Sequence, residues 1–394
     1  MKLFCTTLRH ALTLAIALLP AWAMAADTAT AGEGAPIAMT RAQATAIIAA
    51  NQKIVAPNGI EEQRRLRIGG IEQWISIRGR DLRNPVLLVL HGGPASPDMP
   101  LEWTFQPPWE DYFTVVQWDQ RGAGKTYASN TEEAMAPGMS VEGMTQDAAS
   151  LVAYLRKRFG KERIFVMGHS WGSVLGVELA RRYPEWLHAY VGVGQIVNMR
   201  TNEEAGHAFA LREARRDDNA EAIRELESIA PYPGSEGLTL DRIGIRSKWE
   251  MHYGGLAWGR RDFQWAADAW RLSPAYSDAE IRAIDKGSLF SLRHLLEPLL
   301  AVDFDEATRF RCPVVMFVGA HDYTTSHELT VEWYGKLDAP SKRLVVFADS
   351  AHMIMLEQPG RFLAHLLSDV LPYAQQAGDA APQEETRSTG GFGR

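Results

Sequence analysis

The sequence predicts an α/β protein with a mostly parallel eight-stranded sheet and an inserted helical cap. Three observations support this fold class. Short apolar runs alternate with helical stretches, the later runs are continuous and rich in β-branched residues, and one long interval lacks a strand pattern. Continuous apolar runs are typical of parallel strands that are covered on both faces. With 394 residues, 46% of them hydrophobic, the chain can form one large domain with an insertion or two structural units.

The expected strands are short, and helical stretches separate most of them. The first hairpin is expected to be antiparallel, whereas helical connections make the later strands parallel. The main connecting helices are expected at residues 144–159 and 174–183. The expected strands are residues 64–68, 71–78, 85–90, 113–118, 164–167, 190–193, 313–318 and 343–347.

The interval 197–302 departs from this alternation. It contains amphipathic helical pieces and four tryptophans instead of strands. An insertion of that length between two core strands is expected to be a helical cap, or lid. The core of the fold should then comprise residues 26–196 and 303–374. The tail, residues 375–394, has too few apolar residues to fold and is expected to be disordered.

Residues 1–25 have the features of a signal peptide. Basic residues precede an apolar run at residues 11–19, and small residues mark a cleavage position near Ala25/Ala26. We therefore expect an exported protein, periplasmic or secreted, without a stable membrane anchor. The alternative is an uncleaved anchor, but this uncharged stretch contains Pro20 and is short for a bilayer span of about 20 residues.

Composition argues against several classes of partner. The net charge is −7 at pH 7 and no basic cluster is present, so we expect no nucleic-acid partner.

Once residues 1–25 are removed, Cys312 is the only cysteine. It precedes an apolar run, and we expect a buried small hydrophobe there rather than a reactive thiol. No histidine and carboxylate cluster has zinc spacing, and residues 122–126 lack the first glycine of a phosphate-binding loop, so neither metal nor cofactor is expected.

Residues 168–172 have the pattern Gly-x-Ser-x-Gly, with Ser170 at the centre. The apolar run at residues 164–167 leads into this pattern, and a helical pattern follows it. Such a strand–turn–helix holds a serine in a strained backbone position, and the flanking glycines leave room for the tight turn. A glycine-rich turn with an incidental serine is the alternative. We predict that Ser170 is a nucleophile.

A serine hydroxyl becomes an effective nucleophile only when a base takes its proton. After such a serine, the acid and the histidine follow in chain order, each on a loop that comes after a late strand. Asp322 follows the strand expected at residues 313–318, and His352 follows the one at 343–347. We predict that His352 is the base and that Asp322 orients it. The rival acid, Asp349, is too close to His352 in sequence to approach the imidazole from the usual side.

The oxyanion that forms on an attacked carbonyl needs two backbone N–H donors. One donor should be Trp171, the residue after the nucleophile. The other should come from residues 91–94, His-Gly-Gly-Pro, which follow the strand expected at residues 85–90. Glycine lets the backbone approach the substrate closely, and we favour Gly93 over Gly92 as this donor.

Taken together, these motifs resemble the proline iminopeptidase family of α/β hydrolases. The resemblance covers residues 60–195 and 310–372. It implies an α/β-hydrolase fold that cleaves N-terminal residues, often proline, under a helical cap whose acidic residues hold the substrate's free amine. The motifs are His-Gly-Gly-Pro at 91–94, Trp-Asp-Gln-Arg-Gly-Ala-Gly at 118–124, Gly-His-Ser-Trp-Gly-Ser at 168–173, and the late pair Asp322 and His352.

The chain departs from the pattern of that family at three places. Ala95 replaces the glycine that usually closes the first motif, and His169 stands where a second glycine is common before the serine. The cap lacks the family's Trp-x-x-Trp-Glu segment, and its nearest fragment is Lys-Trp-Glu at residues 248–250. Substrate preference is expected to depend on the cap, which is where the sequence differs most.

Three functions remain open. The first is an aminopeptidase or amidase acting on small peptides, the second is a carboxylesterase or lactonase with the same catalytic residues, and the third is a non-catalytic ligand-binding protein of this fold. We expect one cap carboxylate to turn inward, buried and unpaired, where a cationic substrate amine would compensate it. Our order of preference for this residue is Glu204, Glu203, Glu250. The alternative for each of them is a solvated face. A small molecule or a short peptide is the expected substrate, and the sequence indicates no oligomeric state.

Overall fold

The computed structural model describes residues 39–235 and 237–382 of the chain. The signal peptide expected at residues 1–25 and the end of the tail, residues 383–394, lie outside this part. The helices and strands described below belong to one structural unit that begins at Arg41. Among the described residues, no helix is both long enough and apolar enough to cross a bilayer.

In the described residues, eight strands form one sheet in the order β1-β2-β4-β3-β5-β6-β7-β8. Strand β2 pairs antiparallel with β1 and with β4, and all other neighbours are parallel. The predicted fold class is confirmed. The strands are β1 (Ile60–Ile68), β2 (Ile71–Gly79), β3 (Val86–Leu90), β4 (Thr114–Asp119), β5 (Ile164–His169), β6 (Leu187–Val193), β7 (Val314–Gly319) and β8 (Lys342–Phe347).

The edge strand β1 starts at Ile60, four residues earlier than the sequence pattern indicates. Exposed and half-buried side chains alternate along it, and charged residues such as Glu61 and Arg65 occupy the exposed positions. An edge strand with one solvated face carries few apolar side chains, and its charges discourage pairing with other chains. An apolar pattern therefore identifies only the second half of this strand.

Outside the insertion, helices connect and cover the strands. The longest, α5, begins after Ser140, whose hydroxyl accepts a hydrogen bond from the Gly143 N–H, and it ends at Gly160, where φ is 63°. These helices are α1 (Arg41–Asn51), α2 (Glu102–Phe105), α3 (Gly124–Ala128), α4 (Glu132–Met135), α5 (Val141–Phe159), α6 (Trp171–Arg182), α12 (His327–Lys336), α13 (Ile354–Glu357), α14 (Pro359–His365) and α15 (Pro372–Gln376).

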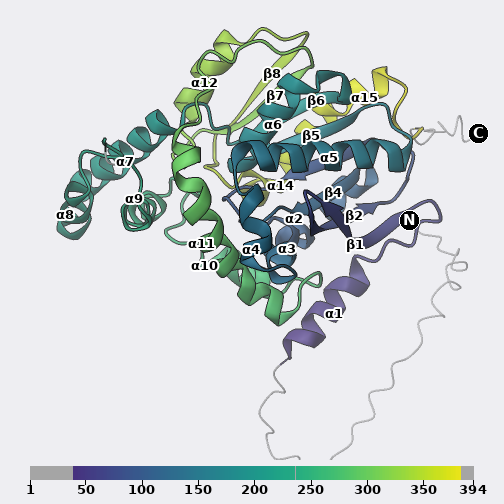
Figure 1. Ribbon diagram of the computed structural model, residues 1–394, viewed down its shortest axis with the longest axis horizontal. Coiled ribbons are helices and arrows are strands. Elements are labelled where there is room, and N and C mark those ends of the chain that lie inside the picture. The colour runs from purple at the N-terminus through teal and green to yellow at the C-terminus, as the bar shows by residue number, and fades with distance from the viewer. Residues whose placement is uncertain (1–38, 236, 383–394) are drawn as a thin grey trace, which may run out of the picture. The chain divides into compact units, whose positions relative to one another are not determined.

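The parallel strands are buried on both faces. On β3, Leu88 and Leu90 pack with residues of α5 and α6, whereas Leu87 and Val89 pack on the opposite face with residues of α14 and α15. Figure 1 shows α5 and α6 in front of the strands and α14 behind them. This two-sided burial explains why the strands appear in the sequence as continuous apolar runs.

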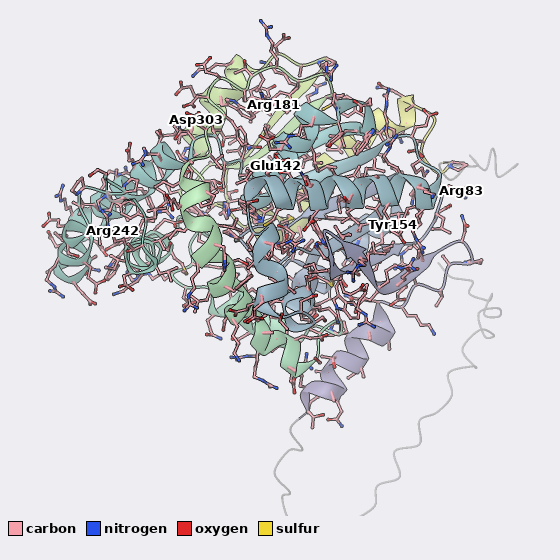
Figure 2. The ribbon with its side chains drawn as sticks, viewed as in Figure 1. Arg83, Glu142, Tyr154, Arg181, Arg242 and Asp303 are labelled. Atoms are coloured by element: carbon pink, nitrogen blue, oxygen red, sulfur yellow. The ribbon has the colours of Figure 1, made fainter. Side chains whose placement is uncertain are left out.

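A helical insertion lies between β6 and β7. Its two ends meet where Asn198 and Asp303 form an antiparallel bridge, supported by a 3.0 Å hydrogen bond from the Met199 N–H to the Val302 carbonyl. In Figure 2, Asp303 marks this junction and Arg242 lies on α9, far out on the insertion. The insertion contains α7 (Met199–Arg216), α8 (Ala220–Ser228), α9 (Leu240–His252), α10 (Gln264–Arg271) and α11 (Asp278–Leu300).

The outer helices of the insertion have a small apolar core of their own. Trp249 of α9 is buried there against alanines of α7 and α8 and against Leu226. Trp258 has a different environment, since it is half-exposed and its ring stacks on the His321 ring with centroids 3.4 Å apart. The tryptophans of the insertion therefore do not share one environment.

The ordered chain continues beyond the boundary expected at residue 375. Asp379 forms an ion pair with Lys161 and accepts a 2.8 Å hydrogen bond from His188 Nε2. His188 is buried, and these bonds attach the tail to the sheet and to the end of α5. The expectation of a disordered tail from residue 375 is therefore corrected for residues 375–382, where polar contacts replace the missing apolar ones.

Candidate active site

Ser170 lies in the turn between β5 and α6. Its backbone has φ 54° and ψ −122°, in the left-handed half of φ that non-glycine residues rarely adopt. The flanking glycines make the turn possible. A β-carbon at Gly172 would lie 1.9 Å from the Leu90 carbonyl oxygen, and one at Gly168 would lie 2.5 Å from the Gly172 carbonyl oxygen. The Gly-x-Ser-x-Gly pattern is thus required by close backbone packing, and it holds the serine at the carboxyl end of β5.

His352 and Asp322 form a hydrogen-bonded pair on the loops that follow β8 and β7. The His352 Nδ1 to Asp322 Oδ2 distance is 2.8 Å, and both residues are buried. Because a carboxylate can only accept, Nδ1 carries the proton and Nε2 is left on the opposite side of the ring as the basic atom. Thr325 fixes the carboxylate with its backbone N–H, at 2.8 Å, and with its hydroxyl, at 2.9 Å.

The His352 ring lies beside the serine turn. Its centroid is 4.7 Å from that of His169, whose Nε2 donates a 3.1 Å hydrogen bond to the His352 carbonyl. Gly194 also approaches the ring so closely that a β-carbon there would lie 2.8 Å from Nδ1. The Ser170 hydroxyl makes no hydrogen bond to His352 in this structure. Such bonds are often long before substrate binds.

The electrostatics of the two neighbouring histidines differ. Burial opposes protonation of His352, but the nearby carboxylates, Asp322 foremost and then Glu250 and Glu357, together raise the pKa of His352 above its ordinary value. His169 has no such partner, and burial lowers its pKa to about 3. His169 is therefore neutral at physiological pH. The rival acid Asp349 is exposed and makes no bond to His352.

The segments predicted to bind the oxyanion lie on either side of Ser170. A β-carbon at Gly92 would come within 3.0 Å of the Ser170 Cβ, so this loop packs against the serine turn. In the described residues, the backbone N–H groups of Gly92, Gly93 and Trp171 donate no hydrogen bond to another protein group. Their role as oxyanion donors, and the choice between Gly92 and Gly93, stay predictions.

The three cap carboxylates have different environments. Glu204, the first preference, is exposed, so the expectation that it points inward is wrong. Glu203 and Glu250 are buried on either side of Arg246, which donates a 2.9 Å hydrogen bond to Glu250 and lies 3.7 Å from Glu203. The Tyr232 hydroxyl also donates to Glu203. The expectation of an unpaired inward carboxylate is therefore corrected, because Arg246 compensates part of the charge.

This buried cluster carries one positive and two negative groups, and it extends to the Asp322 loop. The Thr324 hydroxyl donates a 2.6 Å hydrogen bond to Glu250 Oε1, and Arg246 donates to the Tyr323 carbonyl at 3.0 Å. Burial raises the pKa of Glu250 against the opposing effect of Arg246. When both carboxylates are ionised, the cluster has one excess negative charge, close to Asp322.

Arg246, Thr325 and Gln120 were not singled out from the sequence. Thr325 offers a weak signal, since a hydroxyl residue three positions after an aspartate can close a local turn around it. Arg246 precedes Glu250 by four residues on α9, a spacing that places the two side chains on one helix face.

Within the described residues, no group of three or more histidine, cysteine or acidic side chains could hold a metal ion.

The chain belongs to the alpha/beta hydrolase fold family, whose sequence pattern matches residues 85–359, and it is a hydrolase. It is similar to a Bacillus subtilis (strain 168) protein named Probable aminopeptidase YbaC, with 29% identity over 300 residues, 76% of this chain and 93% of that protein. A proline iminopeptidase of Arabidopsis thaliana is 27% identical over 233 residues, 56% of this chain and 58% of that protein. The predicted resemblance to proline iminopeptidases is confirmed.

A solved structure shares the fold. The crystal structure of a proline iminopeptidase from Mycobacterium smegmatis matches with a TM-score of 0.60 and 21% identity, covering 81% of this chain and all of that one. At this level of identity the match shows the common architecture of sheet and helices. The shared fold does not identify the substrate, which has to be inferred from the residues of this chain.

Proposed function

We propose that this hydrolase acts through an acyl-enzyme on Ser170, with His352 as general base and Asp322 as the group that orients it. The hydrogen-bonded pair of His352 and buried Asp322, placed beside the strained Ser170, carries this proposal. Nucleophile, orienting acid and base follow one another in the chain in that order, as is typical of this fold. A non-catalytic protein would have no need for the strained serine backbone.

The chemistry follows from these positions. The Ser170 Oγ attacks the carbonyl carbon of the substrate while His352 Nε2 takes the hydroxyl proton. Negative charge then develops on the carbonyl oxygen, where N–H groups of Trp171 and of Gly92 or Gly93 can donate. The bond to the leaving group breaks, and His352 returns the proton to it. Water then attacks the acyl-enzyme by the same route, which releases the acid and restores the serine.

We further propose that the natural substrates are small peptides or amides with a free amino terminus. Glu203 and Glu250 supply two carboxylates against the single charge of Arg246, and Thr324 joins Glu250 to the loop of the catalytic acid. A buried excess charge is costly unless a cation compensates it. A substrate ammonium group bound near this cluster supplies that cation. The similarity to proteins named as aminopeptidases supports the same substrate class.

A carboxylesterase or lactonase is the second candidate. Arg246 lies between the two buried glutamates and already contributes a positive charge at that position. Burial also raises the pKa of Glu250, and a protonated Glu250 would leave Arg246 balanced by Glu203, with no excess charge for a substrate amine to compensate. The serine chemistry is the same for an ester. This candidate therefore differs from the first in its substrate and keeps the same catalytic residues.

One substrate panel separates the two candidates. We expect the wild type to cleave an aminoacyl naphthylamide with a free amine faster than its N-acetylated counterpart, because only the free amine can pair with the cap cluster. p-Nitrophenyl esters that lack an amine serve as the reference for the serine chemistry. Equal cleavage of the free and acetylated amides would reject amine recognition and favour the esterase. A Ser170→Ala variant controls for background hydrolysis in every assay.

A further inference from the structure

Gln120, the first residue after β4, lies between the two segments that flank Ser170. Its side-chain Nε2 donates a 3.0 Å hydrogen bond to the His91 carbonyl, and its Oε1 accepts one, also 3.0 Å, from the Trp171 indole N–H. Gln120, His91 and Trp171 are all buried. A single amide thus joins the loop after β3 to the first residue of α6, which are far apart in sequence.

The orientation of this amide is determined by its partners. A backbone carbonyl can only accept a hydrogen bond, and an indole N–H can only donate one. The Gln120 nitrogen must therefore face His91 and its oxygen must face Trp171. Neither partner has freedom to reverse the arrangement, so the amide holds a defined spacing between the two segments.

The His91 side chain adds a second connection. Burial lowers the pKa of His91 to about 4, so the ring is neutral at physiological pH. Its Nδ1 lies 2.8 Å from the Gly92 carbonyl and must be the protonated nitrogen, since that carbonyl can only accept. Its Nε2 then accepts a 3.2 Å hydrogen bond from the Gln120 backbone N–H. Main chain and side chain of Gln120 both hold the loop that contains Gly92 and Gly93.

We propose that Gln120 is a positioning residue for the oxyanion site: it sets the distance between the N–H of Trp171 and the N–H groups of residues 92–93. The proposal rests on the serine mechanism proposed above. Gln120 touches no reacting atom and acts through the two segments that it joins. Donors to an oxyanion stabilise the transition state only when they are placed in advance. A small widening between the segments should therefore slow turnover without weakening substrate binding.

The neighbouring strand offers a matched control. Gln117 of β4 is also a buried glutamine, but its Nε2 donates to Gln106 Oε1 at 2.9 Å, away from the oxyanion segments. Gln120→Met and Gln117→Met each remove one buried amide from the same region and replace it with a side chain of similar length. Only the first removes the side-chain bonds to the His91 carbonyl and to the Trp171 indole. Comparing the two separates positioning from a general loss of stability.

A third variant removes the hydrogen bond between Trp171 and Gln120 by changing its donor instead of its acceptor. Trp171→Phe keeps the backbone N–H and an aromatic ring, but it removes the indole N–H that binds Gln120. If Gln120→Met folds poorly, Trp171→Phe still tests the proposal. In the double variant, Trp171→Phe should add little to Gln120→Met, because the bond that it removes is already lost.

The test measures kcat and KM for an ester and for the matching thionoester, whose sulfur is a poor hydrogen-bond acceptor. We expect Gln120→Met to lower kcat for the ester about 10- to 100-fold, less than the loss of a whole oxyanion donor, with KM nearly unchanged. The preference for ester over thionoester should fall by a similar factor. Gln117→Met should change neither quantity by more than about 2-fold, whatever its melting temperature.

Labelling of the wild type at Ser170 by a fluorophosphonate keeps the two proposals distinguishable. If Ser170 labels but Gln120→Met and Trp171→Phe keep the wild-type kcat and the wild-type preference for the ester, the positioning proposal is overturned and the serine mechanism stands. An equal loss in Gln117→Met also overturns it. If Ser170 does not label, both proposals fall.

Discussion

The carboxyl edge of the sheet and the helical insertion differ in what determines the position of a functional side chain. Ser170, Asp322 and His352 each come soon after a parallel strand, so the order of the strands brings them together at one edge. In the insertion, the adjacent residues Glu203 and Glu204 have opposite environments, one buried and one exposed. A role fixed by backbone geometry can be predicted from sequence, whereas one fixed by helix packing requires the structure.

The largest effect is expected at the sheet edge. Asp322→Asn should lower kcat by a factor on the order of 10³ to 10⁴, because the amide no longer favours the productive tautomer and orientation of His352. Asp349→Asn is the matched control on the neighbouring loop, and it should retain nearly full activity, since Asp349 is exposed. Steady-state kinetics on one substrate check both variants. A reversal of the two effects would mean that the acid has been assigned wrongly.

The next effect concerns the insertion. Glu250→Gln should raise KM for free-amine substrates about 10- to 100-fold, the range expected when a charged hydrogen bond is lost, while sparing esters without an amine. Glu204→Gln is the control on α7, and it should change neither substrate, because its side chain is exposed. If Glu250→Gln affects both substrate classes equally, the cluster is structural and does not recognise an amine.

The pH dependence tests the electrostatics of the sheet edge. Only the neutral form of His352 can act as base, and Asp322 raises the pKa of His352 above its ordinary value of 6.5. The kcat/KM of the wild type should therefore be low at acidic pH and rise with pH through a midpoint above 6.5. In Asp322→Asn, burial still lowers the pKa but the carboxylate is gone, so the midpoint should move to lower pH. A midpoint that stays in place would contradict this account.

The smallest effect concerns the tail, whose order the sequence did not indicate. Asp379→Ala removes the partner of Lys161 and of buried His188. We expect a loss of about 1 kcal/mol in the free energy of unfolding, because the pair is partly exposed and water screens it. Chemical denaturation measures this change.

These contrasts show how far the sequence was informative. Strand positions and the Gly-x-Ser-x-Gly turn follow from local rules of burial and close backbone approach, so they could be predicted. Gln120 and Arg246 could not, because a buried polar side chain acts through partners that are distant in sequence. Glu203 and Glu204 could not be ranked either, since adjacent helix residues differ only in the direction that they face.

The central claim is that Ser170 carries the acyl group, and covalent labelling tests it most directly. The protein is incubated with a fluorophosphonate, digested, and analysed by mass spectrometry alongside a Ser170→Ala variant. We predict one adduct, on the Ser170 hydroxyl, with activity lost in proportion to labelling. The alanine variant should take no label and lose on the order of 10⁴-fold or more in kcat. An adduct on another residue that abolishes turnover, or full activity in the alanine variant, would contradict the account.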